Sequence, residues 1–105
     1  FNPGDGFLYV TTGDTHNGEV PQSPTKIGGK VLRIDRDGKA AADNKAPEGF
    51  DKRIYTYGHR NPQGLYVGPD GAIWLTEHGP QGGDELNRVE RDADYGWPHV
   101  TYGVN

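Results

Sequence analysis

Short apolar runs bounded by turn residues recur along the chain, and they predict β-strands rather than helices. The first run follows the turn dipeptide Asp5-Gly6 and continues, rich in aromatic and β-branched residues, to Thr12. No long segment carries apolar residues at the 3.6-residue spacing of an amphipathic helix. Further strands are expected within residues 31–37 and 86–92, and at Ile54–Tyr57, Gly64–Val67 and Ala72–Thr76.

The chain also contains an internal repeat. Residues 70–77 repeat the pattern of residues 5–12 at a distance of 65 positions, and residues 86–92 repeat that of residues 31–37 at 55. The first copy therefore has the longer loop, around Thr15–Ile27. Repeated four-stranded antiparallel units are typical of β-propellers. We expect an all-β chain of about two antiparallel four-stranded blades of a β-propeller; a small independent β-sandwich is the alternative.

Composition limits what such a chain can be. Hydrophobic residues make up 31% of the 105 residues, while Gly (17) and Pro (8) are abundant, so the chain has little apolar surface to bury alone. We therefore expect residues 1–105 to be part of a larger propeller domain, an internal fragment, as the lack of Met also suggests. The net charge of −4 without a basic block predicts no nucleic-acid partner, and the short apolar runs predict no membrane span.

Candidate chemistry begins on the loop before Pro62. Arg60 and Asn61 lie there between glycine and proline residues, in a turn that can present a guanidinium and a carboxamide to a planar, acidic ligand. The alternative for this pair is an exposed charge beside an ordinary turn former.

A second candidate segment, His78-Gly79-Pro80, follows directly after the predicted strand that ends at Thr76. The main-chain oxygens of such a turn are hard ligands of the kind that calcium favours. The alternatives are an ordinary Gly-Pro turn and a structural role for His78.

Acidic residues flank both segments. Asp84 and Glu85 are adjacent on a predicted strand, so only one of them can face a given pocket. Asp14 follows the first strand at the place equivalent to residues 77–79, so its loop should open at the same end of the propeller. It can be a pocket carboxylate or the first residue of an Asp turn.

Three ordered motifs together resemble one family. Residues 58–65 (GHRNPQGL), 77–87 (EHGPQGGDELN) and 95–98 (YGWP) are similar to the soluble quinoprotein glucose/sorbosone dehydrogenases, and most closely to their aldose sugar dehydrogenase branch. Residues 13–14 and 28–34 add support, so the resemblance covers nearly the whole chain.

The resemblance implies a six-bladed propeller that binds pyrroloquinoline quinone (PQQ) over calcium. Such enzymes oxidise the anomeric carbon of an aldose sugar to a lactone and pass electrons to an external acceptor. It implies that Arg60 and Asn61 hold PQQ oxygens and that the carbonyls of Gly79 and Pro80 bind calcium. His78 takes a cofactor-contacting position where the glucose dehydrogenase branch has glutamine.

The same resemblance matches Asp14 to the carboxylate that orients the family's catalytic histidine, and Asp84 to an acidic residue near the cofactor. That general-base histidine would fall upstream of Phe1, and none of His16, His59 and His99 matches its position. We therefore expect the chain alone to be inactive, because hydride abstraction needs a base within reach of the sugar hydroxyl.

Two other readings of the fold remain open. One is a non-catalytic β-propeller module that binds other proteins. The other is a calcium-dependent lactonase propeller, whose ring of metal-binding carboxylates and Asn these loops do not supply. A homo-oligomer that completes the ring from copies of this chain is also possible. The family resemblance implies a periplasmic or secreted location.

Overall fold

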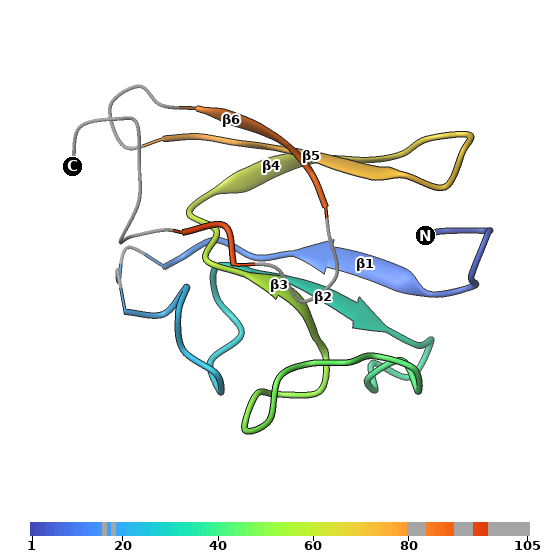
Figure 1. Cartoon of the computed structure of the whole chain (residues 1–105), viewed down its shortest axis with the longest axis horizontal. Helices are drawn as coiled ribbons and strands as arrows, with labels where there is room; N and C mark the ends of the chain where they lie inside the picture. Colours follow the sequence, from blue (N-terminus) through green and yellow to red (C-terminus); the bar gives the residue numbers. More distant parts are fainter. Residues whose placement is uncertain (16, 18, 80–83, 90–93, 97–105) are drawn as a thin grey trace.

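Two three-stranded antiparallel sheets make up the regular structure of the chain (Figure 1). The computed structural model describes residues 1–15, 17, 19–79, 84–89 and 94–96. Among these residues it has no helix, and hence none long and apolar enough to cross a membrane. The strands, in chain order, are β1 (Leu8–Thr11), β2 (Lys30–Ile34), β3 (Ile54–Tyr57), β4 (Pro62–Val67), β5 (Ile73–Glu77) and β6 (Glu85–Arg88). The prediction of an all-β chain without helices is confirmed for these residues.

The sequence repeat is a structural repeat. Val10 of β1 pairs with Leu32 of β2, and Leu75 of β5 pairs with Asn87 of β6. These are the same positions after shifts of 65 and 55 residues, so the β1–β2 and β5–β6 hairpins share one register. The ten extra residues of the first copy lie in the loop between β1 and β2, as predicted.

The strand count differs from the expected four per blade, because each sheet has three strands among the described residues. With the two hairpins aligned, β4 precedes its hairpin in one sheet and β3 follows its hairpin in the other. Each sheet therefore contains three strands of a four-stranded repeat: the first sheet has the strand that follows the hairpin, and the second has the strand that precedes it.

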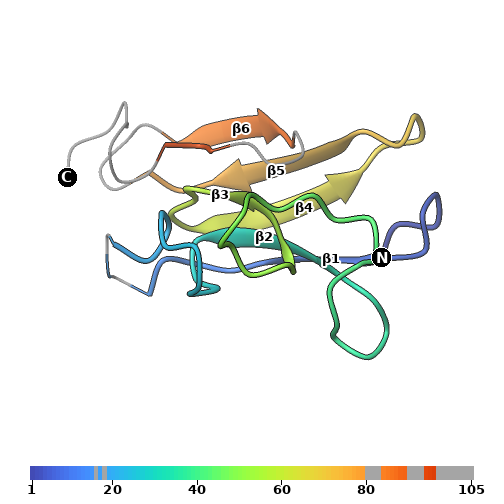
Figure 2. The same cartoon turned by 60° about the horizontal axis from the view of Figure 1, so that its bottom comes forward.

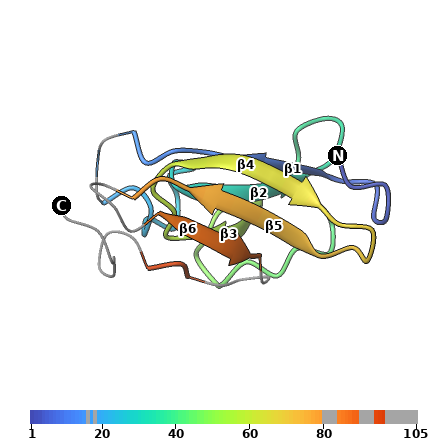
Figure 3. The ribbon, with the colours of Figure 1, turned by 90° about the horizontal axis from the view of Figure 1, so that it is seen from above.

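The two sheets pack face to face (Figures 2 and 3). Tyr9 and Val31 from the first sheet form one buried cluster with Ile73, Leu75 and Val89 from the second. In β5 the buried and exposed positions alternate, as expected of a strand that faces a core on one side. The last buried position of this strand is a carboxylate, Glu77, rather than an apolar residue.

Lys30 fixes the long loop between β1 and β2. Its side chain is fully buried, and its ammonium donates to the main-chain oxygens of Val20 (2.6 Å) and Gly28 (2.9 Å). Burial lowers the pKa of Lys30 to about 8, because desolvation penalises the charged form. The loop thereby returns to the start of β2 beside the end of β1.

Candidate functional site

Three connections meet at one end of the two sheets, on the left in Figure 1. They are the loop after β1, the turn between β3 and β4, and the loop after β5. The Asp14 main-chain N–H donates to the carbonyl of Arg60 at 2.8 Å, and the His78 N–H donates to the carbonyl of Asn61 at 3.1 Å. The expectation that the loops after the two repeated strands open at the same end is therefore confirmed, and Arg60 and Asn61 lie between them.

The turn between β3 and β4 is anchored by His59, whose side chain is fully buried. The His59 Nδ1 lies 2.5 Å from Glu77 Oε2, and Nε2 lies 2.7 Å from Thr56 Oγ1. A carboxylate only accepts hydrogen bonds, so Nδ1 carries a proton, and the Thr56 hydroxyl can serve either state of Nε2. The Tyr95 ring stacks on the imidazole with centroids 4.7 Å apart.

Glu77 joins this anchor to the main chain of the turn. Its Oε1 accepts the main-chain N–H of Arg60 at 2.8 Å, and its Oε2 also accepts Asn87 Nδ2 at 3.3 Å. Glu77 is 5% exposed, and a carboxylate so deeply buried needs such partners. Two oxygens at the end of β5 therefore hold residues 59 and 60 in place.

The side chain of Arg60 reaches from the turn to the loop after β5. Its Nη1 donates to the main-chain oxygens of Gly79 (3.1 Å) and His78 (3.3 Å). The carbonyl of Gly79, which was predicted to bind calcium, thus accepts a hydrogen bond from the Arg60 guanidinium in this structure. Asn61 follows Arg60 in the turn, and its Oδ1 accepts a hydrogen bond from Gln63 Nε2 at 2.6 Å. Pro80, the other predicted calcium ligand, lies outside the described residues.

His78 and Asp84 lie together on the surface next to this turn. Their side chains are 62% and 63% exposed, and His78 Nδ1 is 3.7 Å from Asp84 Oδ2. Asp84 Oδ1 also accepts the main-chain N–H of Gly79 at 2.7 Å, which fixes the turn that carries the Gly79 carbonyl. A depression of about 320 Å³ adjoins both residues.

The cationic group at this site contacts main-chain oxygens. No group of three or more His, Cys, Asp or Glu side chains suited to a metal occurs in the described part of the chain. The carbonyls of His78 and Gly79 nevertheless converge on a cationic group, the Arg60 guanidinium. Main-chain oxygens are among the hard ligands that calcium takes in proteins.

Sequence reasoning missed His59, Glu77 and the residues that support them. His59 drew attention only because it does not match the position of the general base. The signal for Glu77 was available in the strand pattern, because this residue falls in phase with Ile73 and Leu75 and so points to the buried side of β5. A carboxylate in that phase indicates a buried partner.

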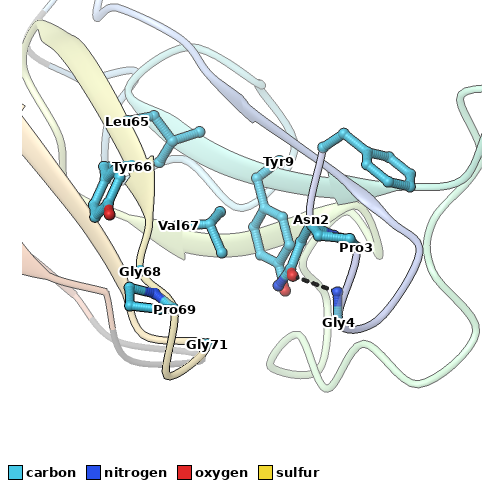
Figure 4. Close-up of a pocket in the computed structure, with 11 residues that line it drawn as sticks. Asn2, Pro3, Gly4, Tyr9, Leu65, Tyr66, Val67, Gly68, Pro69 and Gly71 are labelled. Carbon is cyan, nitrogen blue, oxygen red and sulfur yellow. Dashed lines mark hydrogen bonds between the residues drawn. The ribbon is translucent and has the colours of Figure 1, made fainter.

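A groove that is larger than the depression beside His78 and Asp84 lies elsewhere and contains none of the predicted site residues (Figure 4). It measures about 720 Å³ and lies between the turn at Asn2–Gly4 and the turn that joins β4 to β5. Tyr9, Tyr66 and Val67 line it. Both of these turns are at the end of the sheets opposite to Arg60.

Comparison with known proteins assigns the chain to a family. The family model "Glucose / Sorbosone dehydrogenase" matches residues 1–105, so the chain belongs to the glucose/sorbosone dehydrogenase family. Aldose sugar dehydrogenase YliI of Escherichia coli K12 is 39% identical over 97% of the chain, which spans 28% of that relative's length. The resemblance predicted from the three motifs is thereby confirmed.

Solved structures agree with the fold. A crystal structure of a glucose dehydrogenase matches all of the chain with a TM-score of 0.93 and 42% identity, over 31% of its own length. The PQQ-bound form of an aldose sugar dehydrogenase from Streptomyces coelicolor matches 90% of the chain, over 27% of its own length, with a TM-score of 0.83 and 36% identity. The chain thus has the fold of a section of a sugar dehydrogenase propeller, as predicted.

Proposed function

We propose that the chain forms part of a PQQ- and calcium-dependent aldose sugar dehydrogenase and contributes one side of its cofactor site. The observation that carries it is that the Arg60 guanidinium donates to the His78 and Gly79 carbonyls, next to Asn61 in the same turn. A relative of the same fold is known in a PQQ-bound form, which supports this cofactor. The rest of the site would come from other blades, since the chain spans less than a third of these relatives.

In this proposal the residues of the chain bind and orient. Arg60 and Asn61 would hold PQQ oxygens, with His78 and Asp84 beside the cofactor. The carbonyls of Gly79 and Pro80 would bind calcium. PQQ, when bound, supplies the acceptor for the hydride of the anomeric carbon, which leaves a lactone, and an external acceptor then takes the electrons. Asp14 would orient the general-base histidine.

The proposal is tested by cofactor binding to the complete dehydrogenase that carries these residues. Metal-free protein is titrated with PQQ in excess calcium, and the quinone absorbance is followed. We expect calcium-dependent binding that Arg60→Gln weakens by at least about tenfold, because a charge-assisted contact is lost. Arg53→Gln is the control, since Arg53 is paired with Asp51 at 2.6 Å before β3. Absence of PQQ binding by the unaltered protein would contradict the proposal and favour a non-catalytic propeller.

The chain alone is expected to lack the general base that removes the proton of the sugar hydroxyl. With PQQ, calcium, and glucose or arabinose, it should not reduce a redox dye above the background of free PQQ. The complete dehydrogenase should reduce the dye under the same conditions. Robust turnover by the 105 residues alone would show that a base within the chain had been overlooked.

We also propose a periplasmic or secreted location for the complete enzyme, on the family resemblance. Fractionation of cells that express it, with activity measured in each fraction, tests this. Activity confined to the cytoplasmic fraction would contradict it.

A further inference from the structure

The two repeated hairpins provide an internal comparison for Glu77. Under the 65-residue shift Glu77 corresponds to Thr12, and both occupy the same register opposite the second strand of their hairpin. The Thr12 hydroxyl stays within its own hairpin, where it contacts the main chain of Ile27 (2.5 Å) and Lys30 (3.2 Å). This register therefore forms without a carboxylate, and Glu77 serves some other need.

A second difference points the same way. Asn87, which donates to Glu77 Oε2, corresponds to Leu32 of the first hairpin under the 55-residue shift. Leu32 is a buried apolar residue at 5% exposure. One hairpin thus fills these positions with a threonine and a leucine, and the other fills them with a hydrogen-bonded polar pair. A buried carboxylate is costly unless it finds partners, so the presence of Glu77 needs a reason beyond strand formation.

The hydrogen bonds of the Glu77 carboxylate supply that reason, because they join the β5–β6 hairpin to a different part of the chain. They end on the side chain of His59 and the main-chain N–H of Arg60, in the turn between β3 and β4. Main-chain bonds with Gly29, Asp14 and His78 also hold this turn, as does the side-chain bond between Thr56 and His59. Glu77 adds a buried carboxylate at the end of β5, where the Gly79 loop begins, and this carboxylate bonds both His59 and the Arg60 N–H.

We propose that Glu77, acting through His59 and the Arg60 N–H, is the positioning residue for the cofactor-binding turn. It does not touch the cofactor. Its carboxylate sets where the Arg60 guanidinium and the Asn61 amide stand relative to the Gly79 carbonyl. This inference rests on the proposed function, because it gives Arg60 and Asn61 a cofactor to hold.

The test measures PQQ affinity of the complete dehydrogenase by quinone absorbance in excess calcium. Glu77→Gln keeps the shape of the side chain but replaces one acceptor oxygen with an NH2 group, which cannot accept the N–H groups that Glu77 binds. The PQQ Kd should therefore rise by about tenfold or more. Glu85→Gln is the matched control, because Glu85 pairs with Glu77 across the strands and bonds Asn87 but does not contact the turn. It should change the Kd by less than about twofold.

A double variant separates positioning from general loosening. If Glu77 acts through Arg60, then Glu77→Gln added to Arg60→Gln should weaken PQQ binding by no more than about twofold further, since coupled residues are not additive. Full additivity would overturn the inference, and so would an unchanged Kd in the single variant. Should Glu77→Gln fail to fold, Glu77→Thr copies the residue that the same register accepts in the first hairpin, and the same outcomes apply.

The two proposals fail in different ways. If the unaltered protein binds no PQQ, the proposed function falls and this inference falls with it. If the unaltered protein binds PQQ and loses affinity with Arg60→Gln but not with a change at Glu77, only the positioning role of Glu77 is wrong.

Discussion

The guanidinium of Arg60 donates to the main-chain oxygen of Gly79 at 3.1 Å, the oxygen that the family resemblance assigns to calcium. Two cations drawn to one oxygen repel each other when they are near it, most strongly away from bulk water. If calcium binds the Gly79 oxygen as proposed, we expect the Arg60 guanidinium to leave this oxygen and to pair with an acidic group of PQQ instead.

This competition predicts opposite effects of one substitution. Arg60→Gln should raise the affinity of the PQQ-free complete protein for calcium by about threefold or more, because a competing positive charge is removed. The same change weakens PQQ binding. Calorimetric titration with calcium in the absence of PQQ measures the first effect, and Arg53→Gln serves as the control. A lower calcium affinity in Arg60→Gln would show that the guanidinium does not compete for the metal.

Asp14 gives a second prediction, for turnover rather than binding. Its main-chain N–H donates to the Arg60 carbonyl at 2.8 Å, which places it beside the turn that carries Arg60 and Asn61. If it orients the general base, Asp14→Asn in the complete enzyme should lower kcat by about 100-fold or more. The PQQ Kd should stay within about twofold.

A suitable control for Asp14 is Asp70→Asn. Asp70 accepts the Ala72 N–H at 3.0 Å in the turn between β4 and β5, at the opposite end of the sheets. Its replacement should leave kcat unchanged. Equal kcat values for the Asp14 variant and the unaltered enzyme would remove Asp14 from the catalytic group.

Gly29 gives a third prediction, because its backbone and its neighbours both exclude a side chain. It has a φ of +65°, and an added Cβ would lie 2.6 Å from the His59 carbonyl oxygen and 2.7 Å from Pro21. Gly38 has a φ of +80° with open space around it. Gly38→Ala should therefore cost about 1 kcal/mol of unfolding free energy from strain alone.

Gly29→Ala should cost about 2 kcal/mol more than Gly38→Ala, because main-chain atoms must move. It should also weaken PQQ binding, since the His59 N–H donates to the Gly29 carbonyl at 3.0 Å. Chemical denaturation of the complete protein measures the first effect and quinone absorbance the second. Equal losses of stability in the two variants would show that the contact with His59 can relax.

Much of the strand layout follows from the sequence alone. The turn dipeptides and apolar runs located all six strands, and the repeat gave the register shared by the two hairpins. The same repeat placed the Asp14 loop and the His78 loop at one end. These features depend on local patterns, which is why they could be predicted.

The contacts within the site depend on distant residues and could not be predicted in this way. Glu77 meets His59 across 18 residues because the turn between β3 and β4 folds back on the end of β5. The placement of Arg60 on the carbonyls of His78 and Gly79 requires the same turn. A strand pattern shows that Glu77 is buried, but it does not show which partner it has.

Lys30 gives the last prediction, a stability that rises with pH. Its pKa is lowered from 10.5 to about 8 in the folded protein by burial, so the unfolded chain binds more protons between these two pH values. The free energy of unfolding therefore increases as the pH rises through this window. Below pH 8 the full cost of burying the ammonium is present.

The pH dependence can be isolated by comparison with Lys30→Met, which has no ammonium to bury. The stability of the unaltered protein relative to this variant should grow by about 2 kcal/mol between pH 8 and pH 10. Tyr9 and Tyr57, whose pKa values burial raises, favour unfolding at still higher pH, but they are present in both proteins. Denaturant titrations at each pH measure the difference. A difference that stays constant would show that Lys30 keeps its ordinary pKa, and that its bonds to Val20 and Gly28 offset the cost of burial.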